Sequence, residues 1–251
     1  MFTKVRQVRA FESIIQQVET AILQGNLTAG DRLPSERELQ EMLEVSRNTL
    51  RESLRVLEQK GLIEIRQGNR GGIFVKEINA DSMADNLGLF VQSQRITMEQ
   101  ISEFRQDLEG LVSRRAALRA DSKTMGEVDQ LLAKAEDLSR KGPSRWDAFM
   151  QADKEIHLAL ARLAGNPLHH FFLETVHTNF HRYHINTYLP RDEKTIRTTL
   201  RELKAIVKAV SRGDAERAER MAREHVRRAT ESMKQAMASS AVSQSTDRRS
   251  P

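Results

Sequence analysis

One stretch of the sequence combines basic and amide side chains at a spacing suited to contact with nucleic acid. In a helix that starts after Ser46, 100° per residue places Asn48, Arg51 and Arg55 on one side. The opposite side carries three leucines at i, i+4 and i+7, which are Leu50, Leu54 and Leu57. Such a helix can place its N-terminal polar residues in the major groove against base edges. A solvated charged face on an ordinary helix pair is the alternative, because charged helix faces are common.

A second group of residues offers metal-ligating and anion-binding side chains. Asp153 and His157 are four residues apart, so their side chains leave the same helix face. His225 lies in a later segment, AREHVRRA, and Arg105 precedes Glu109 by one turn in SEFRQDLEGLVSRRAA. Each of these residues taken singly is more often structural than functional. Together, the aspartate and the two histidines could also serve a metal-dependent hydrolase with an open position for water.

The stretch LPSERELQEMLEVSRNTLRESLRVL, residues 33–57, predicts two short helices joined by a tight turn, which is a helix-turn-helix. Ser35 and Glu38 form an S-x-x-E capping box that marks the start of the first helix. Ser46 can cap the second helix. An amphipathic helix over residues 5–24 precedes this pair and can pack behind it.

A two-stranded wing is predicted to follow the second helix. Gly61 can end that helix in a left-handed cap, and the apolar residues of LIEI then give a short strand. The turn QGNRGG leads into a second strand at residues 73–75. Its tip carries Arg66, Gln67 and Arg70 among glycines that allow close approach of the backbone to a phosphate.

Residues 33–75 resemble, nearly position for position, the winged helix-turn-helix of the GntR family of bacterial transcription regulators. The resemblance covers about the first 76 residues and implies a DNA-binding domain at 1–78 that recognises a short GT…AC palindrome. Asn48 stands where the family often has threonine, and this difference affects the expected operator sequence. The resemblance implies DNA contacts from Arg37, Ser46, Arg47, Asn48, Arg51, Gln67 and Gly68.

Composition sets further bounds. A chain of 251 residues with 39% hydrophobic and 30% charged residues can form two modest, helix-rich domains. The net charge of +5 is compatible with DNA binding, but any strongly positive surface must be local. The absence of cysteine excludes disulfides and thiolate metal ligands. We find neither a signal peptide nor an apolar run long enough to span a bilayer, so we expect a cytoplasmic protein with no membrane partner.

From about residue 79 onward, the apolar periodicity predicts an all-α helical bundle. The overall fold class is therefore mainly α, with a small β-wing in the N-terminal domain. Residues 239–251 have too little apolar content to pack, and we predict a disordered tail there. The amphipathic segments of the bundle, which we place within 79–238, are 82–92, 97–120, 124–141, 145–164, 167–189, 192–212 and 214–237.

This bundle resembles the FCD-type effector-binding and dimerisation domain of the FadR subfamily of GntR regulators. In that subfamily, an aspartate and a histidine one turn apart and two later histidines hold a metal that binds a small carboxylic acid. The resemblance implies that Asp153, His157 and His225 are metal ligands, with zinc, nickel or manganese as the metal. It also implies that Arg105 binds the carboxylate of the acid.

The chain departs from the subfamily at one ligand position. The third histidine usually follows a glutamate, and the aligned pair here is Glu202-Leu203. Three outcomes are open: a weakened three-ligand site, a site repaired by His181 or His184, or no metal, with the acid bound directly by histidines and an arginine. His177, His181 and His184 form a stripe at i, i+4 and i+7, which we expect on the polar surface because no acidic neighbour fixes their tautomers.

Two classes of function fit these residues. A ligand-responsive transcription regulator would bind a palindromic operator as a homodimer and respond to a small carboxylic acid. A metal-dependent hydrolase on the helical domain would leave the winged domain as an unexplained appendage. The sequence therefore predicts a regulator and not an enzyme.

Overall fold

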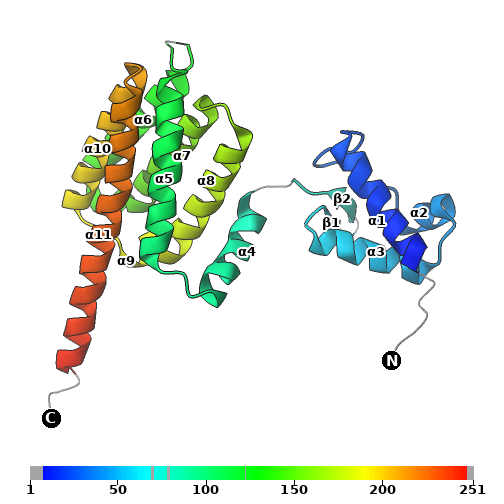
Figure 1. The fold of residues 1–251 in the computed structure, drawn as a ribbon. Coiled ribbons are helices and arrows are strands. Elements are labelled where there is room, and N and C mark those ends of the chain that lie inside the picture. The colour runs from blue at the N-terminus through cyan, green and yellow to red at the C-terminus, as the bar shows by residue number, and fades with distance from the viewer. Residues whose placement is uncertain (1–7, 69–70, 78–79, 122, 248–251) are drawn as a thin grey trace. The chain divides into compact units, whose positions relative to one another are not determined.

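The computed structural model describes the backbone of residues 8–68, 71–77, 80–121 and 123–247. The chain forms two compact units, Met1–Ser82 and Met83–Pro251, which we call the head unit and the helical unit (Figure 1). The division falls four residues after the predicted boundary. The predicted mainly α fold with a small β-wing is confirmed. Among the described residues, no helix is long and apolar enough to cross a membrane.

The head unit begins with three helices, and side-chain caps set the starts of the second and third. They are α1 (Val8–Leu23), α2 (Glu36–Leu43) and α3 (Arg47–Gln59). The capping box at α2 is confirmed, because the Glu38 amide donates to Ser35 Oγ and the Ser35 amide donates to the Glu38 carboxylate. Ser46 Oγ accepts from the Thr49 amide at 3.2 Å and starts α3.

The leucine stripe of α3 forms the centre of the head core. Leu50, Leu54 and Leu57 are at most 2% exposed, and they pack in one cluster with Ile14 and Ile15 of α1. Burial of three leucines on one side of α3 fixes its rotation, because turning the helix would expose them to water. The opposite, polar side of α3 therefore faces solvent.

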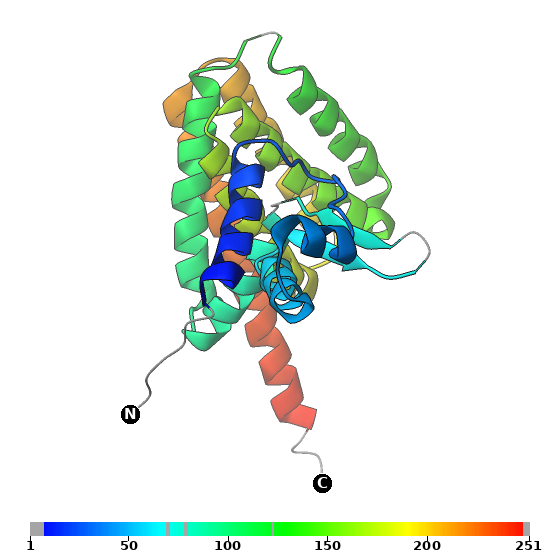
Figure 2. The same cartoon turned by 90° about the vertical axis from the view of Figure 1, so that its right-hand side faces the viewer.

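The wing consists of β1 (Ile63–Arg66) and β2 (Gly72–Val75), which pair antiparallel from Ile63 opposite Val75 to Arg66 opposite Gly72 (Figure 2). A Cβ at Gly71 would lie 2.5 Å from the Arg66 carbonyl oxygen, so no larger residue fits there without a shift of the backbone. Arg32 Nη2 donates to the Gly71 carbonyl at 2.8 Å and braces the wing against the body of the unit. Arg70 of the predicted tip lies outside the described residues.

The helical unit is a bundle in which α5 contacts α7, α8, α10 and α11 (Figure 1). The segment predicted as one helix over 167–189 is instead interrupted by a π-helical turn, His181–Ile185, and followed by the short α9 (Asn186–Tyr188). The longer helices are α4 (Ala80–Ser93), α5 (Met98–Ala117), α6 (Gly126–Arg140), α7 (Trp146–Leu163), α8 (Pro167–Phe180), α10 (Glu193–Ser211) and α11 (Ala215–Asp247).

The end of the chain differs from the prediction of a disordered tail over 239–251. The helix α11 continues to Asp247, and residues 248–251 lie outside the described part. Extending an existing helix costs much less than nucleating one, so weakly helical residues can be added to a packed helix without burial of their own.

Candidate functional site

The residues expected to contact DNA all lie exposed on the head unit. They come from α2, from the start of α3 and from the wing: Arg37, Ser46, Arg47, Asn48, Arg51, Gln67 and Gly68. Two of the arginines pair with carboxylates, since Arg51 Nε lies 2.9 Å from Glu36 Oε2 and Arg37 Nε lies 3.0 Å from Glu41 Oε1. Exposed ion pairs of this kind are weak, so both guanidinium groups can exchange a carboxylate for a phosphate or a base.

A cluster of ionisable side chains lies buried in the helical unit. Asp153 and His157 come from α7 and His225 comes from α11, and one ligand atom from each lies within 4.8 Å of the others. All three side chains are at most 4% exposed. The structure thus brings together three residues that are up to 72 positions apart in the sequence.

His225 is oriented by a carboxylate on the far side of its ring. Its Nδ1 lies 2.9 Å from Glu202 Oε2, and its Nε2 lies 3.6 Å from Asp153 Oδ1. Arg228 in turn donates to Glu202 Oε1. Burial alone would lower the pKa of His225, but the hydrogen bond to Glu202 and the charge of Asp153 outweigh it and raise that pKa. A histidine held by a carboxylate in this way presents its other nitrogen to a ligand.

Glu109 of α5 is the second carboxylate of the cluster and is 1% exposed. Its Oε1 accepts from Arg105 Nε at 2.9 Å, from Arg105 Nη2 at 2.7 Å and from His177 Nε2 at 3.1 Å. His157 Nδ1 lies 3.1 Å from Glu109 Oε2, but the angles of this contact do not suit a hydrogen bond. Oε2 therefore has no hydrogen-bond partner among the described residues. Burial would raise the pKa of Glu109, but the charges of Arg105 and of the two histidines hold it well below its usual range.

Arg105 is 3% exposed and forms an ion pair with Glu109 in the interior, not the surface pair that its i, i+4 spacing could also have produced. Its guanidinium carbon lies 4.3 Å from the centroid of the Phe180 ring. Nη1 is buried and has no hydrogen-bond partner among the described residues. The two N–H groups of Nη1 therefore remain available to an anion.

The predicted surface position of the histidine stripe is wrong for His177, which is fully buried on the side of α8 that packs against α5 and α7. Its acidic partner, Glu109, is 68 residues away in the sequence, so the residues around the stripe give no sign of it. His181 and His184 are partly buried, and the His181 ring lies 5.9 Å from that of His177. The π-helical turn changes the helical phase at these positions.

The donor atoms fit the metal that the family resemblance implies. Asp153 Oδ1 and His157 Nε2 are buried and have no hydrogen-bond partner within the part of the chain that the structure describes. Burial lowers the pKa of His157 to about 4, which keeps its ring neutral at pH 7. Neutral imidazoles and carboxylates are ligands of zinc, nickel and manganese. A second possible set, Glu109, His157 and His177, also has donors within 4.8 Å. We favour the first set because Arg105 already forms an ion pair with Glu109, and its positive charge would repel a metal ion bound there.

One sequence signal could have indicated the buried pair in advance. The buried face of α5 includes Ile101, Val112 and Ala116, and Arg105 and Glu109 fall on the same face at helical spacing. A charged pair within an otherwise small and apolar stripe indicates an internal ion pair. Leu203, at the position where the subfamily usually has its third histidine, is fully buried in the core.

The structure thus combines a winged helix-turn-helix with a helical unit that contains buried polar donors. Comparison with known proteins agrees. Residues 10–75 match the gntR family of bacterial regulatory proteins, and residues 100–228 match the FCD domain. The chain belongs to the GntR family of transcription regulators that contain an FCD domain, and the hydrolase interpretation is not supported.

Two relatives from Escherichia coli illustrate the similarity. The chain is 31% identical to the Uxu operon transcriptional regulator of strain K12 over 161 residues, which is 64% of this chain and 60% of that protein. It is 31% identical to the HTH-type transcriptional repressor NanR of strain E2348/69 over 157 residues, 62% of this chain and 59% of that protein. The matches thus span about three fifths of the length of these relatives. A Streptococcus agalactiae GntR structure shares the fold, with a TM-score of 0.64, 23% identity, and coverage of 88% of this chain and 99% of that one.

The internal ion pair yields a prediction about stability. Glu109→Gln removes the charge that neutralises the buried Arg105, and we expect a loss of roughly 3–5 kcal/mol in the free energy of unfolding measured in urea. The double variant Arg105→Leu with Glu109→Leu should be more stable than this single variant, because it leaves no unpaired charge. Glu193→Gln, in an exposed pair with Arg197, is the control and should change little. A Glu109→Gln variant as stable as the control would disprove the role of the pair.

Proposed function

We propose that this regulator binds an inverted-repeat operator as a homodimer and that a small carboxylic acid in the helical unit alters its affinity for DNA. The observation that carries the DNA part is the rotation of α3, which buries three leucines and exposes Arg47, Asn48 and Arg51 at the helix start. This is the arrangement in which a recognition helix places its first turns in the major groove. One of the relatives, NanR, is named a transcriptional repressor, which favours repression here as well.

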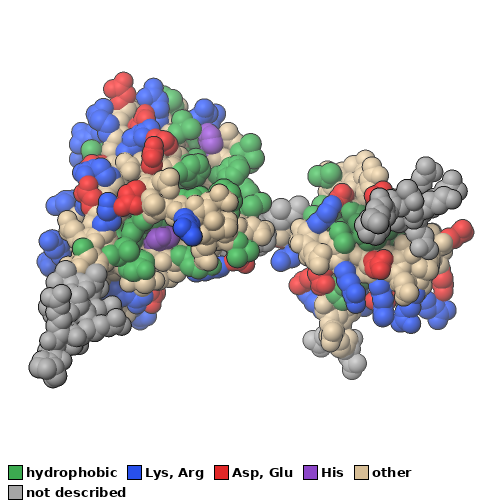
Figure 3. Space-filling view, turned by 60° about the horizontal axis from the view of Figure 1, so that its bottom comes forward, with side chains coloured by type: hydrophobic (Ala, Val, Ile, Leu, Met, Phe, Trp, Pro, Cys, Tyr) green, Lys and Arg blue, Asp and Glu red, His purple; other side chains and the backbone are tan. Residues whose placement is uncertain are grey.

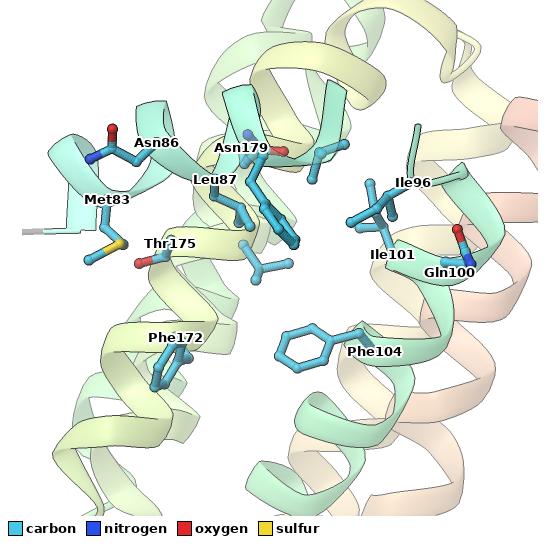
Figure 4. Close-up of a pocket in the computed structure, with 13 residues that line it drawn as sticks. Met83, Asn86, Leu87, Ile96, Gln100, Ile101, Phe104, Phe172, Thr175 and Asn179 are labelled. Carbon is cyan, nitrogen blue, oxygen red and sulfur yellow. The ribbon is translucent and has the colours of Figure 1, made fainter. Parts of the chain in front are cut away.

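A homodimer is supported by an apolar surface on the helical unit. A pocket of about 620 Å³ lies between α4, α5 and α8, where Phe104 of α5 and Phe172 of α8 stand on its two walls (Figure 4). Phe90, Phe104 and Phe172 are 48–53% exposed, and hydrophobic side chains gather on one side of this unit (Figure 3). Monomeric proteins rarely expose such a group of aromatic rings. A second copy of the chain can cover this surface around a twofold axis.

The acid is proposed to bind at the buried cluster. Arg105 offers the two N–H groups of Nη1 to a carboxylate, and Asp153, His157 and His225 would hold a divalent metal beside it. When bound, such a metal would polarise and position the oxygens of the acid. Binding that favours one arrangement of the helical unit over others would shift the population of DNA-binding conformers.

Selection of bound sequences from a random DNA pool tests the DNA proposal. Arg47→Ala and Arg51→Ala should each weaken binding to the selected duplex by roughly 1–3 kcal/mol if the arginine contacts a base edge. Titration should give two chains per duplex. Lys60→Ala is the control, because Lys60 is also half exposed but pairs with Glu19 of α1. Unchanged selection and affinity in both arginine variants would refute the assignment of α3 as the recognition helix.

A thermal-shift screen of organic acids tests the effector proposal, since a ligand that binds only the folded protein raises its melting temperature. An effective acid should also change DNA affinity. Arg105→Lys keeps the positive charge beside Glu109 but loses the planar guanidinium group that can donate two hydrogen bonds to a carboxylate. We therefore expect normal DNA affinity and at least a tenfold weaker response to the acid. Arg114→Lys, on the exposed side of α5, should respond normally. An equal response in the two variants would exclude Arg105 as the anchor.

Elemental analysis of protein purified without an affinity tag tests the metal proposal. We expect less than one equivalent in the parent, because Asp153, His157 and His225 provide three ligands. Leu203→His should raise the content toward one equivalent, whereas Ala205→His, on another side of α10, should not. Circular dichroism verifies that each variant is folded. A full equivalent in the parent that is lost on His181→Ala would show that His181 completes the site instead.

A further inference from the structure

Five basic side chains line one surface cavity of about 280 Å³ where α10 turns into α11. Three of them belong to α10, and the fourth is the residue that caps its C-terminus. These four follow one another at spacings of three, four and four residues, so they form a single stripe along the helix. The fifth comes from the start of α11. These residues, which we call the basic stripe, are Arg201, Lys204, Lys208, Arg212 and Arg217, and all five are exposed.

The basic stripe largely lacks counter-charges, unlike the other arginines of α10 and α11. Lys204 pairs with Glu136 of α6 at 2.8 Å, but the other four side chains form no ion pair or hydrogen bond within the described part of the chain. The neighbouring arginines of the same two helices are paired: Arg197, Arg220, Arg223, Arg227 and Arg228 each contact a carboxylate.

The acidic residue that lines the same cavity does not neutralise the stripe. Asp214 Oδ1 accepts from the backbone amide of Arg217 at 3.1 Å and caps the start of α11. A protein with a net charge of +5 and 35 acidic residues thus leaves four cations together without partners in the described residues. Their mutual repulsion is relieved when a polyanion binds, because several phosphates are neutralised at once and condensed counterions are released.

We propose that the basic stripe binds the phosphate backbone of duplex DNA, in addition to the contacts of the winged head. This inference rests on the proposed function, in which the head unit binds duplex DNA, so that the phosphates of the duplex are present at high effective concentration once the head is bound. Exposed lysines and arginines on one helix face suit contact with phosphates, which needs charge and reach but no fixed register with the bases. The stripe therefore adds affinity without adding sequence specificity.

The test compares two variants of the full chain that carry the same net charge. The stripe variant changes Arg201, Lys208, Arg212 and Arg217 to Gln. The control variant changes Arg114, Arg197, Arg220 and Arg227 to Gln, and each of these four is exposed and paired in the parent. Both lower the net charge from +5 to about +1, since four cations are removed. Affinity for a random-sequence duplex of about 60 base pairs is measured by fluorescence anisotropy between about 50 and 200 mM KCl.

The slope of log K against log salt is negative, and we expect its magnitude to decrease in the stripe variant by about 0.9 for each phosphate that the stripe no longer neutralises. The decrease should be clearly smaller in the control variant. An equal decrease in the magnitude of the slope in the two variants would show that only the net charge matters, and it would overturn the proposal. An unchanged slope in the stripe variant would also overturn it and would point to an acidic protein as the partner. The Arg51→Ala variant distinguishes failure of the stripe proposal from failure of the recognition-helix proposal. This variant should lose its preference for the selected operator sequence but keep the salt dependence that the basic stripe contributes.

Discussion

The helical unit depends on one buried carboxylate, that of Glu109. A negative charge in a protein interior is costly unless it is paired and hydrogen-bonded. Glu109 satisfies this constraint through Arg105 of its own helix and His177 of α8, with His157 of α7 at 3.1 Å. Three helices must therefore keep their relative rotation, because any shift that separates these side chains leaves an unpaired charge in the core. The same constraint aligns the polar atoms that face a ligand.

A second carboxylate acts in the same way at the other side of the cluster. Glu202 of α10 holds one nitrogen of His225, and the other nitrogen is directed at Asp153. The residue after Glu202 is Leu203, which extends the apolar core where a further donor could have stood. The chain thus keeps the support of a ligand site and removes one possible ligand. For the metal site that we propose, this combination predicts weaker binding that is more readily reversed.

The two units use charge in opposite ways. In the interior of the helical unit, Arg105 and Glu109 neutralise each other, and Nη1 of Arg105 has no hydrogen-bond partner among the described residues. On the head unit and along the basic stripe, cations remain exposed, and some have no partner in the described residues. Exposed cations lose little solvation when they meet phosphates and respond strongly to salt, whereas the buried donors select a small ligand by geometry.

Much of the head unit follows from the sequence by itself, because its signals are local. The caps at Ser35 and Ser46 and the leucine spacing of α3 act over a few residues, and the structure contains the predicted helices and wing. The histidine cluster is different. Nothing near His177 in the sequence indicates its acidic partner, because Glu109 is 68 residues away. Pairings at this range exist only once helices pack, and the π-helical turn then sets which histidines face inward. Local sequence thus determined the DNA-binding elements, and tertiary packing decided the arrangement of the ligand site.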